Sequence, residues 1–174
     1  MIFRNYSKRK AIRYFKKLDV QKLVSLSDSV QRFCVNETEN GRNYYHHLPL
    51  KSTKHLALDI DNWDLSSSDI ENIKNSCRTL FQYFNNAFIL FKNESSDIIK
   101  EKLLPPWVVF PLYDRHSMYW HMGDGEAYEG LFSDILCSLS KEEFAAYQIR
   151  YPIPAYMDET GEGYMGYRYI PQDV

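Results

Sequence analysis

Residues 66–91 read SSSDIENIKNSCRTLFQYFNNAFILF, and this stretch decides the fold class. The serines at 66–68 and Asp69 are residue types that favour the start of a helix. Apolar side chains then recur at the spacing of an amphipathic helix, at Ile70, Ile73, Cys77, Leu80, Phe81, Phe84, Phe88 and Phe91. The pattern predicts a core helix with an inward stripe of Ile73, Cys77, Leu80, Phe84 and Phe88.

The sequence before this stretch predicts two further helices and one short strand. Ser7 is a good cap for an amphipathic helix over residues 7–25, with apolar positions at Ile12, Phe15, Leu18 and Leu23. Ser27 and Asp28 favour the start of a short second helix that ends at the polar cluster 36–43. A loop to Pro49 follows, and the alternating residues 54–61 are typical of a strand.

The sequence after this stretch predicts three helices separated by extended segments. Serines at 95 and 96 precede a helix over 97–103, and two prolines at 105 and 106 end it, so that 107–111 is expected to be extended. Residues 112–121 are expected to form a short strand, and Gly123-Asp124-Gly125 a turn before a helix that begins at Glu126. Ser140 and Glu143 match a capping box for the last helix.

These elements predict a mainly α fold with a few short strands, in one helical bundle-like domain over residues 1–174. A chain of 174 residues has the length of a single core. The tail from about residue 152 is rich in proline and glycine, so we expect it to be irregular.

The cysteines and the apolar runs indicate a cytoplasmic protein. Cys34, Cys77 and Cys137 lie far apart in apolar stretches, which is typical of buried, reduced thiols. The N-terminus turns basic without an apolar signal region, and no apolar run approaches the roughly 18 residues of a membrane span. We therefore expect no secretion, no membrane partner and chemically quiet thiols.

The net charge of −2 conceals a separation of charge along the chain. The first 22 residues carry Asp19 as their one acidic residue and the cations Arg4, Lys8, Arg9, Lys10, Arg13, Lys16, Lys17 and Lys22. From Gly123 onward, carboxylates predominate. The basic helix would suit nucleic-acid phosphates, but its cations alternate with an apolar stripe. The favoured interpretation is a solvated face that pairs with the acidic C-terminal third, so nucleic acid is not an expected partner.

No motif of catalysis, of a cofactor site or of a metal site is present. Asp124 and Glu126 form an imaginable carboxylate pair, with His116 or His121 as proton-transfer partner, but acidic residues in a first helical turn are also ordinary capping residues. His46, His47 and His55 do not have the spacing of metal ligands. We expect no catalytic residue, no metal and no cofactor.

One longer segment is distinctive as a whole. It runs from Pro105-Pro106-Trp107 through Tyr119-Trp120-His121-Met122-Gly123-Asp124-Gly125-Glu126-Ala127-Tyr128 to Tyr151-Pro152-Ile153-Pro154. This pattern resembles small uncharacterised bacterial proteins of the toxin-immunity kind, which are encoded beside polymorphic toxins. The resemblance covers about the last 70 residues of the 174. It implies a toxin as partner and assigns no site residue.

The leading hypothesis is a protein-binding module that neutralises a cognate bacterial toxin by occluding its active site. It depends on the missing catalytic motifs, on the 16% aromatic content, and on an acidic third that suits a basic nuclease surface. The expected contacts are Asp124, Glu126, Tyr128 and Glu129. Two alternatives stay open: a small enzyme that uses residues 116–126, and a nucleic-acid-associated accessory protein that uses the basic N-terminal helix.

Overall fold

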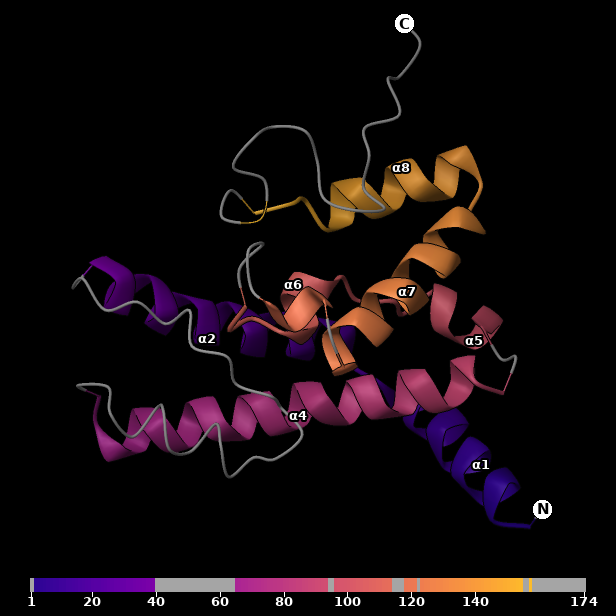
Figure 1. Cartoon of the computed structure of the whole chain (residues 1–174), viewed down its shortest axis with the longest axis horizontal. Coiled ribbons are helices and arrows are strands. Elements are labelled where there is room, and N and C mark those ends of the chain that lie inside the picture. The colour runs from indigo at the N-terminus through magenta and orange to yellow at the C-terminus, as the bar shows by residue number, and fades with distance from the viewer. Residues whose placement is uncertain are drawn as a thin grey trace, which may run out of the picture.

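The computed structural model describes residues 2–39, 65–93, 96–113, 118–121, 123–154 and 157. Within these residues the chain forms α-helices and one 3-10 helix, and no strand occurs. The elements are α1 (Ile2–Lys17), α2 (Val20–Glu39), α4 (Ser67–Phe91), α5 (Ser96–Lys100), α6 (Pro106–Val109), η1 (Met118–His121), α7 (Gly123–Cys137) and α8 (Lys141–Arg150). The expected mainly α class is confirmed (Figure 1).

Helix α4 is the central element of the fold, as the sequence predicts. It starts where expected, because the Ser66 side chain accepts a hydrogen bond from the Asp69 amide at 3.1 Å. The helix packs against α1, α2, α5, α6 and α7. Its predicted stripe is buried except for Phe88, which is only half-buried and stacks on Phe84. Tyr83, Ala87 and Leu90 belong to the buried face as well.

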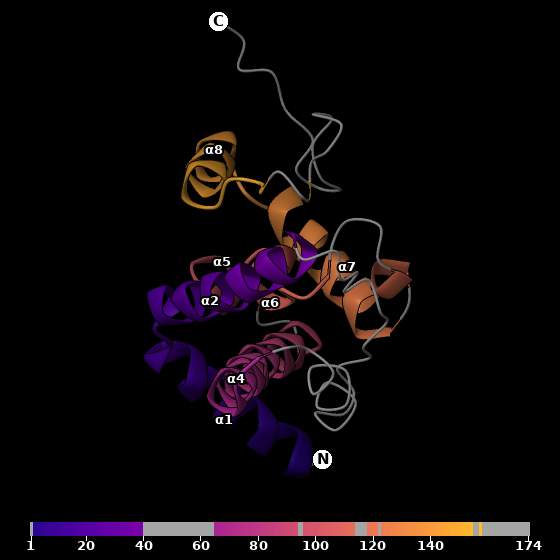
Figure 2. The same ribbon diagram turned by 90° about the vertical axis from the view of Figure 1, so that its left-hand side faces the viewer.

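The other helices are arranged around α4 in an order that two views at right angles agree on (Figures 1 and 2). Helix α1 lies at one end of the molecule, beneath α4, and α8 lies at the opposite end. The short helix α6 packs against both α2 and α4. The N-terminal basic helix and the last helix are therefore far apart.

The predicted starts of the first two helices and the predicted end of the first are wrong, whereas α2 ends within the predicted polar cluster 36–43. Helix α1 already begins at Ile2, so Ser7 is an interior residue, and the chain breaks at 18–19 instead of continuing to residue 25. Asp19 starts the next helix, because its carboxylate accepts a hydrogen bond from the Lys22 amide at 3.1 Å. Helix α2 then runs through Ser27 and Asp28 without interruption. Ser27 does not cap a helix there, because it lies inside α2 and is fully buried.

The expected extended stretch at 107–111 is also largely wrong, because two prolines start a helical turn. Pro106 occupies the first position of α6, where a missing amide costs nothing and the fixed φ of proline suits a helix. The amides of Val108 and Val109 both donate to the carbonyl of Pro105, at 3.0 and 3.2 Å. Helix α5 ends at Lys100, earlier than the predicted residue 103.

Of the strand expected over 112–121, the described residues 118–121 form the 3-10 helix η1. The predicted strand 54–61, the loop to Pro49 and most of the tail lie outside the described residues. The last two helices are closer to expectation. The capping box of α8 is confirmed, because the Ser140 amide donates to the Glu143 carboxylate at 2.7 Å and the Glu143 amide donates to Ser140 Oγ at 3.2 Å.

Candidate partner-binding surface

The candidate contact residues all lie on α7, and the structure assigns them to different environments. The helix starts at Gly123, so Asp124 and Glu126 lie in its first turns and not before it. The φ of Gly123 is 69°, in the left-handed region that favours glycine. Glu126 is exposed, while Asp124 and Glu129 are half-buried. Tyr128 has no exposed surface. The four residues therefore do not share one surface.

Tyr128 is excluded from the proposed contact surface because it belongs to a buried cluster of tyrosines. Its hydroxyl donates to the Leu104 carbonyl at 2.7 Å. On α4, the Tyr83 hydroxyl donates to the Lys102 carbonyl at 3.1 Å and accepts from the Leu104 amide at 2.9 Å. On α8, the Tyr147 hydroxyl donates to the Leu103 carbonyl at 3.1 Å. Three helices are thus tied to the segment 102–104, and sequence reasoning placed Tyr128 on the wrong side of its helix.

Burial changes the acidity of this cluster. Removal from water raises the pKa of Tyr128 well above its ordinary value, because the phenolate would be buried beside Tyr83. The pKa of Tyr83 is raised for the same first reason, although hydrogen bonds from Tyr128 and the Leu104 amide act against it. Both hydroxyls stay protonated at neutral pH, so their role is to hold the backbone of 102–104.

The carboxylates of Asp124 and Glu126 can still contact a cation from another molecule. Neither side chain has a hydrogen bond or an ion pair within the described part of the chain. Both lie near the N-terminus of α7, the positive end of its dipole. Glu129 does have an interaction, and we do not count it as available. Asp124 is half-buried, and its charge acts on the buried Tyr113. The pKa of Tyr113 is raised first by burial, then by Cys77 and then by Asp124.

The aromatic residues that favoured a binding surface are used mainly in the core of the described chain. Rings from several helices meet in the interior, where Phe110 packs edge-on against Tyr128 and Trp120, and Trp107 against Phe132. The exposed large apolar side chains among the described residues are Ile98 and Ile149. Ile149, 82% exposed, lies off the inward stripe of Phe144 and Tyr147 on α8, a position that helical spacing alone could have identified.

The alternative catalytic site is not assembled in the described residues. His121 is exposed at the end of η1 and has no hydrogen bond to Asp124 or Glu126, and His116 lies outside the described residues. The described residues contain no group of three side chains that could hold a metal ion. Among residues 118–121 and 123–126, no acid, base and nucleophile are brought together.

A groove of about 450 Å³ lies between α5 and α8. Its charged walls are Asp97, Lys100, Glu101, Glu143 and Arg150. Three of these groups already have partners, since Lys100 pairs with Asp97 at 3.6 Å and Glu143 belongs to the capping box. The remaining charges have mixed sign, so this groove offers no clear preference for one kind of ligand.

The thiols differ more than the sequence predicts. Cys77 is buried on α4, and burial raises its pKa to about 12, which keeps the thiol protonated and unreactive. Cys137 is free and exposed at the end of α7, so the prediction that it is shielded is wrong. It is the last residue of α7 and follows the buried Leu136.

No helix among the described residues is long and apolar enough to span a membrane. In comparisons with known proteins, no protein-family model, no curated protein and no solved structure matches this chain.

Proposed function

We propose that this protein is a cytoplasmic binding protein that neutralises a cognate bacterial toxin by covering its active site, and that Asp124 and Glu126 contact the toxin. One observation carries the proposal. These carboxylates lie in the first turns of a well-packed helix, and neither has a hydrogen bond or an ion pair within the described chain. Their charge is available to an incoming cation.

The packing of α7 supports a role in recognition. Tyr128, Leu131, Phe132 and Ile135 are buried on its inner face, so the backbone that carries the two carboxylates is held in place. An ordered backbone loses less entropy on binding than a mobile segment does, and a charge on it speeds the encounter with a surface of opposite sign. A toxin that acts on nucleic acid needs such a basic surface for phosphate, and carboxylates can occupy it in place of phosphate.

The test is a capture experiment with two matched variants. The full-length protein, its double variant Asp124→Lys with Glu126→Lys, and the control Asp134→Lys are each used to capture proteins from the native host. Asp134 is an exposed carboxylate on the same helix, so its reversal controls for a general change of charge. We expect wild type and control to capture the same protein, and the double variant to lose it.

The captured protein is then produced in a heterologous bacterium with and without each form. An immunity role predicts that it arrests growth, and that wild type and control relieve the arrest while the double variant does not. Equal capture by all three forms would remove Asp124 and Glu126 from the interface. A captured protein without toxicity would contradict the immunity role.

A further inference from the structure

Helix α1 carries cations on one side over residues 9–17. It has no acidic residue in its first turn and ends in Lys16 and Lys17. At 3.6 residues per turn, the cations of this stretch fall within an arc of about 120° on the helix surface. All of them are exposed, and we call this set the α1 cationic face: Arg9, Lys10, Arg13, Lys16 and Lys17.

The orientation of this face is fixed by the packing of the opposite side. Ala11 and Phe15 are fully buried, and the Phe15 ring lies 5.5 Å from that of Tyr83 on α4. Lys102 donates from Nζ to the carbonyls of Phe15 and Leu18, at 2.8 and 3.1 Å, and so holds the C-terminal end of α1. The apolar side of α1 packs in the core, and the cations on the opposite side therefore point outward.

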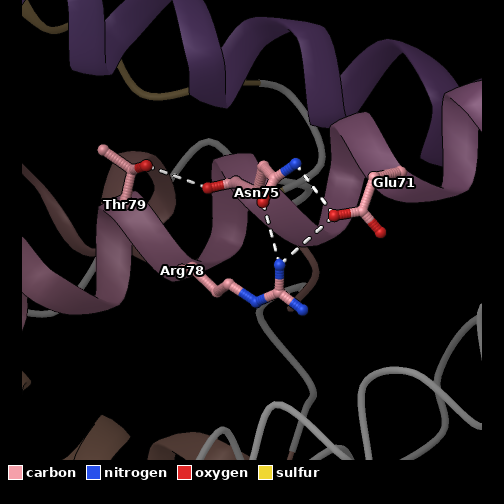
Figure 3. A network of polar contacts seen from close by, with 4 residues as sticks. All are labelled: Glu71, Asn75, Arg78 and Thr79. Atoms are coloured by element: carbon pink, nitrogen blue, oxygen red, sulfur yellow. Dashed lines mark hydrogen bonds and ion pairs between the residues drawn. The ribbon is translucent and has the colours of Figure 1, made fainter.

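Two other cations have structural partners, which the α1 cationic face lacks within the described chain. Lys8 donates to the Asn93 carbonyl at 3.2 Å, at the C-terminal end of α4. On the outer side of α4, Arg78 contacts Glu71 at 3.4 Å and Asn75 at 2.8 Å (Figure 3). Within the described chain, the residues of the α1 cationic face make no ion pair and no side-chain hydrogen bond.

The expected pairing of this face with the acidic C-terminal third does not occur among the described residues. Helix α1 packs on α4 and α5, and both views place α8 at the other end of the molecule. Asp19, the nearest acidic residue in the sequence, accepts a hydrogen bond from the Lys22 amide at the start of α2. Among the described residues, no acidic side chain forms an ion pair with the α1 cationic face, in a chain whose net charge is −2.

We propose that the α1 cationic face binds the phosphate backbone of duplex nucleic acid without sequence preference. From residue 9 to residue 17 the helix rises about 12 Å, and duplex DNA carries about one charge per 1.7 Å of its axis, so the face can meet several phosphates at once. No aromatic ring belongs to the face, which disfavours base stacking on single strands. Its apolar side is buried, which disfavours insertion into a lipid surface. This inference is independent of the proposed toxin contact on α7.

The test measures binding of a fluorescein-labelled random-sequence DNA duplex to the full-length protein by anisotropy, over a series of salt concentrations. Five phosphate contacts predict a slope of about −4.5 for log K against log salt, or roughly a 500-fold loss of affinity between 50 and 200 mM. The double variant Arg13→Gln with Lys17→Gln should reduce this to a slope of about −2.7, or roughly a 40-fold loss. The control Arg78→Gln removes an exposed but paired cation and should leave the slope unchanged.

Folding is checked on the same samples. Because the substituted side chains are exposed, the melting temperature should stay within about 2 °C of wild type. The second pair Arg9→Gln with Lys16→Gln should change the slope by the same amount and guards against a local effect of Lys17 at the helix end. Absence of duplex binding at 50 mM salt, an unchanged slope in both pairs, or an equal loss in Arg78→Gln would overturn the proposal. So would tighter binding to phosphatidylserine-containing vesicles than to the duplex.

Discussion

On α7, residues that are neighbours in sequence lie in different environments. Tyr128 points inward and holds the Leu104 carbonyl at 2.7 Å, whereas Asp124 and Glu126 keep carboxylates without a partner in the described chain. A tyrosine close to carboxylates in the sequence is therefore no evidence of a mixed contact surface. The buried side chains of α7 determine stability, and we propose that its carboxylates determine recognition. The predictions below test this division.

The largest expected effect is the loss of a buried ring on the inner side. Tyr128→Ala and Phe84→Ala should each lower the free energy of unfolding by about 3–5 kcal/mol, because both side chains are buried and their rings are in contact. Urea unfolding followed by circular dichroism measures this loss. A loss below about 1 kcal/mol would mean that the ring is not part of a packed core.

Alkaline pH should weaken the same face. The pKa values of Tyr83 and Tyr128 are raised in the folded state, so the unfolded chain ionises first, near pH 10. Their contribution is complete below pH 10 and is lost as the pH rises toward the folded values. Above pH 10, the free energy of unfolding should fall by about 1.4 kcal/mol per pH unit for each tyrosine. Urea titrations at stepped pH measure the fall, and a flat profile between pH 10 and 12 would contradict it.

Removing only the hydroxyl of Tyr128 isolates its hydrogen bond. Tyr128→Phe keeps the ring but leaves the buried Leu104 carbonyl without its closest donor, and should cost about 1–3 kcal/mol. The same urea measurement applies, with Tyr14→Phe on the half-buried side of α1 as a control that should cost less. Equal losses in both variants would show that the contact with segment 102–104 contributes little.

The thiols offer a comparison that needs no mutation. Exposed Cys137 should react with a thiol reagent within minutes in the folded protein, while buried Cys77 should react only on unfolding. Mass spectrometry of labelled peptides over time separates the two. Fast labelling of Cys77 would mean that the centre of α4 opens readily.

The sequence predicts those parts of the fold whose signals are local. Ser66 at the start of α4 and the pair Ser140 and Glu143 at the start of α8 are recognisable because a cap is made by residues three apart. The break after α1 was not predictable in this way, because Lys102, far along the chain, holds the carbonyls of Phe15 and Leu18.

For the candidate site, helical periodicity predicts the direction of a side chain better than closeness in the sequence does. Tyr128 continues the spacing of Leu131, Phe132 and Ile135, which are buried on the same side of α7, so its inward direction could have been predicted. The availability of Asp124 and Glu126 could not, since it depends on which side chains the fold brings near them. The separation of the α1 cationic face from α8 likewise follows from the packing of α1 on α4 and α5.

The smallest expected effect on stability belongs to the residues with the largest proposed effect on binding. The double variant Asp124→Lys with Glu126→Lys should lower the free energy of unfolding by about 1–2 kcal/mol, because two weak attractions to the helix dipole become weak repulsions. The most direct measurement is the association rate with the captured partner, at low and at high salt, on samples whose melting temperature is also recorded. The account predicts that the double variant associates about tenfold more slowly at low salt, while Asp134→Lys associates at nearly the wild-type rate. A lowered melting temperature with an unchanged association rate would contradict it and leave these carboxylates as helix-stabilising residues only.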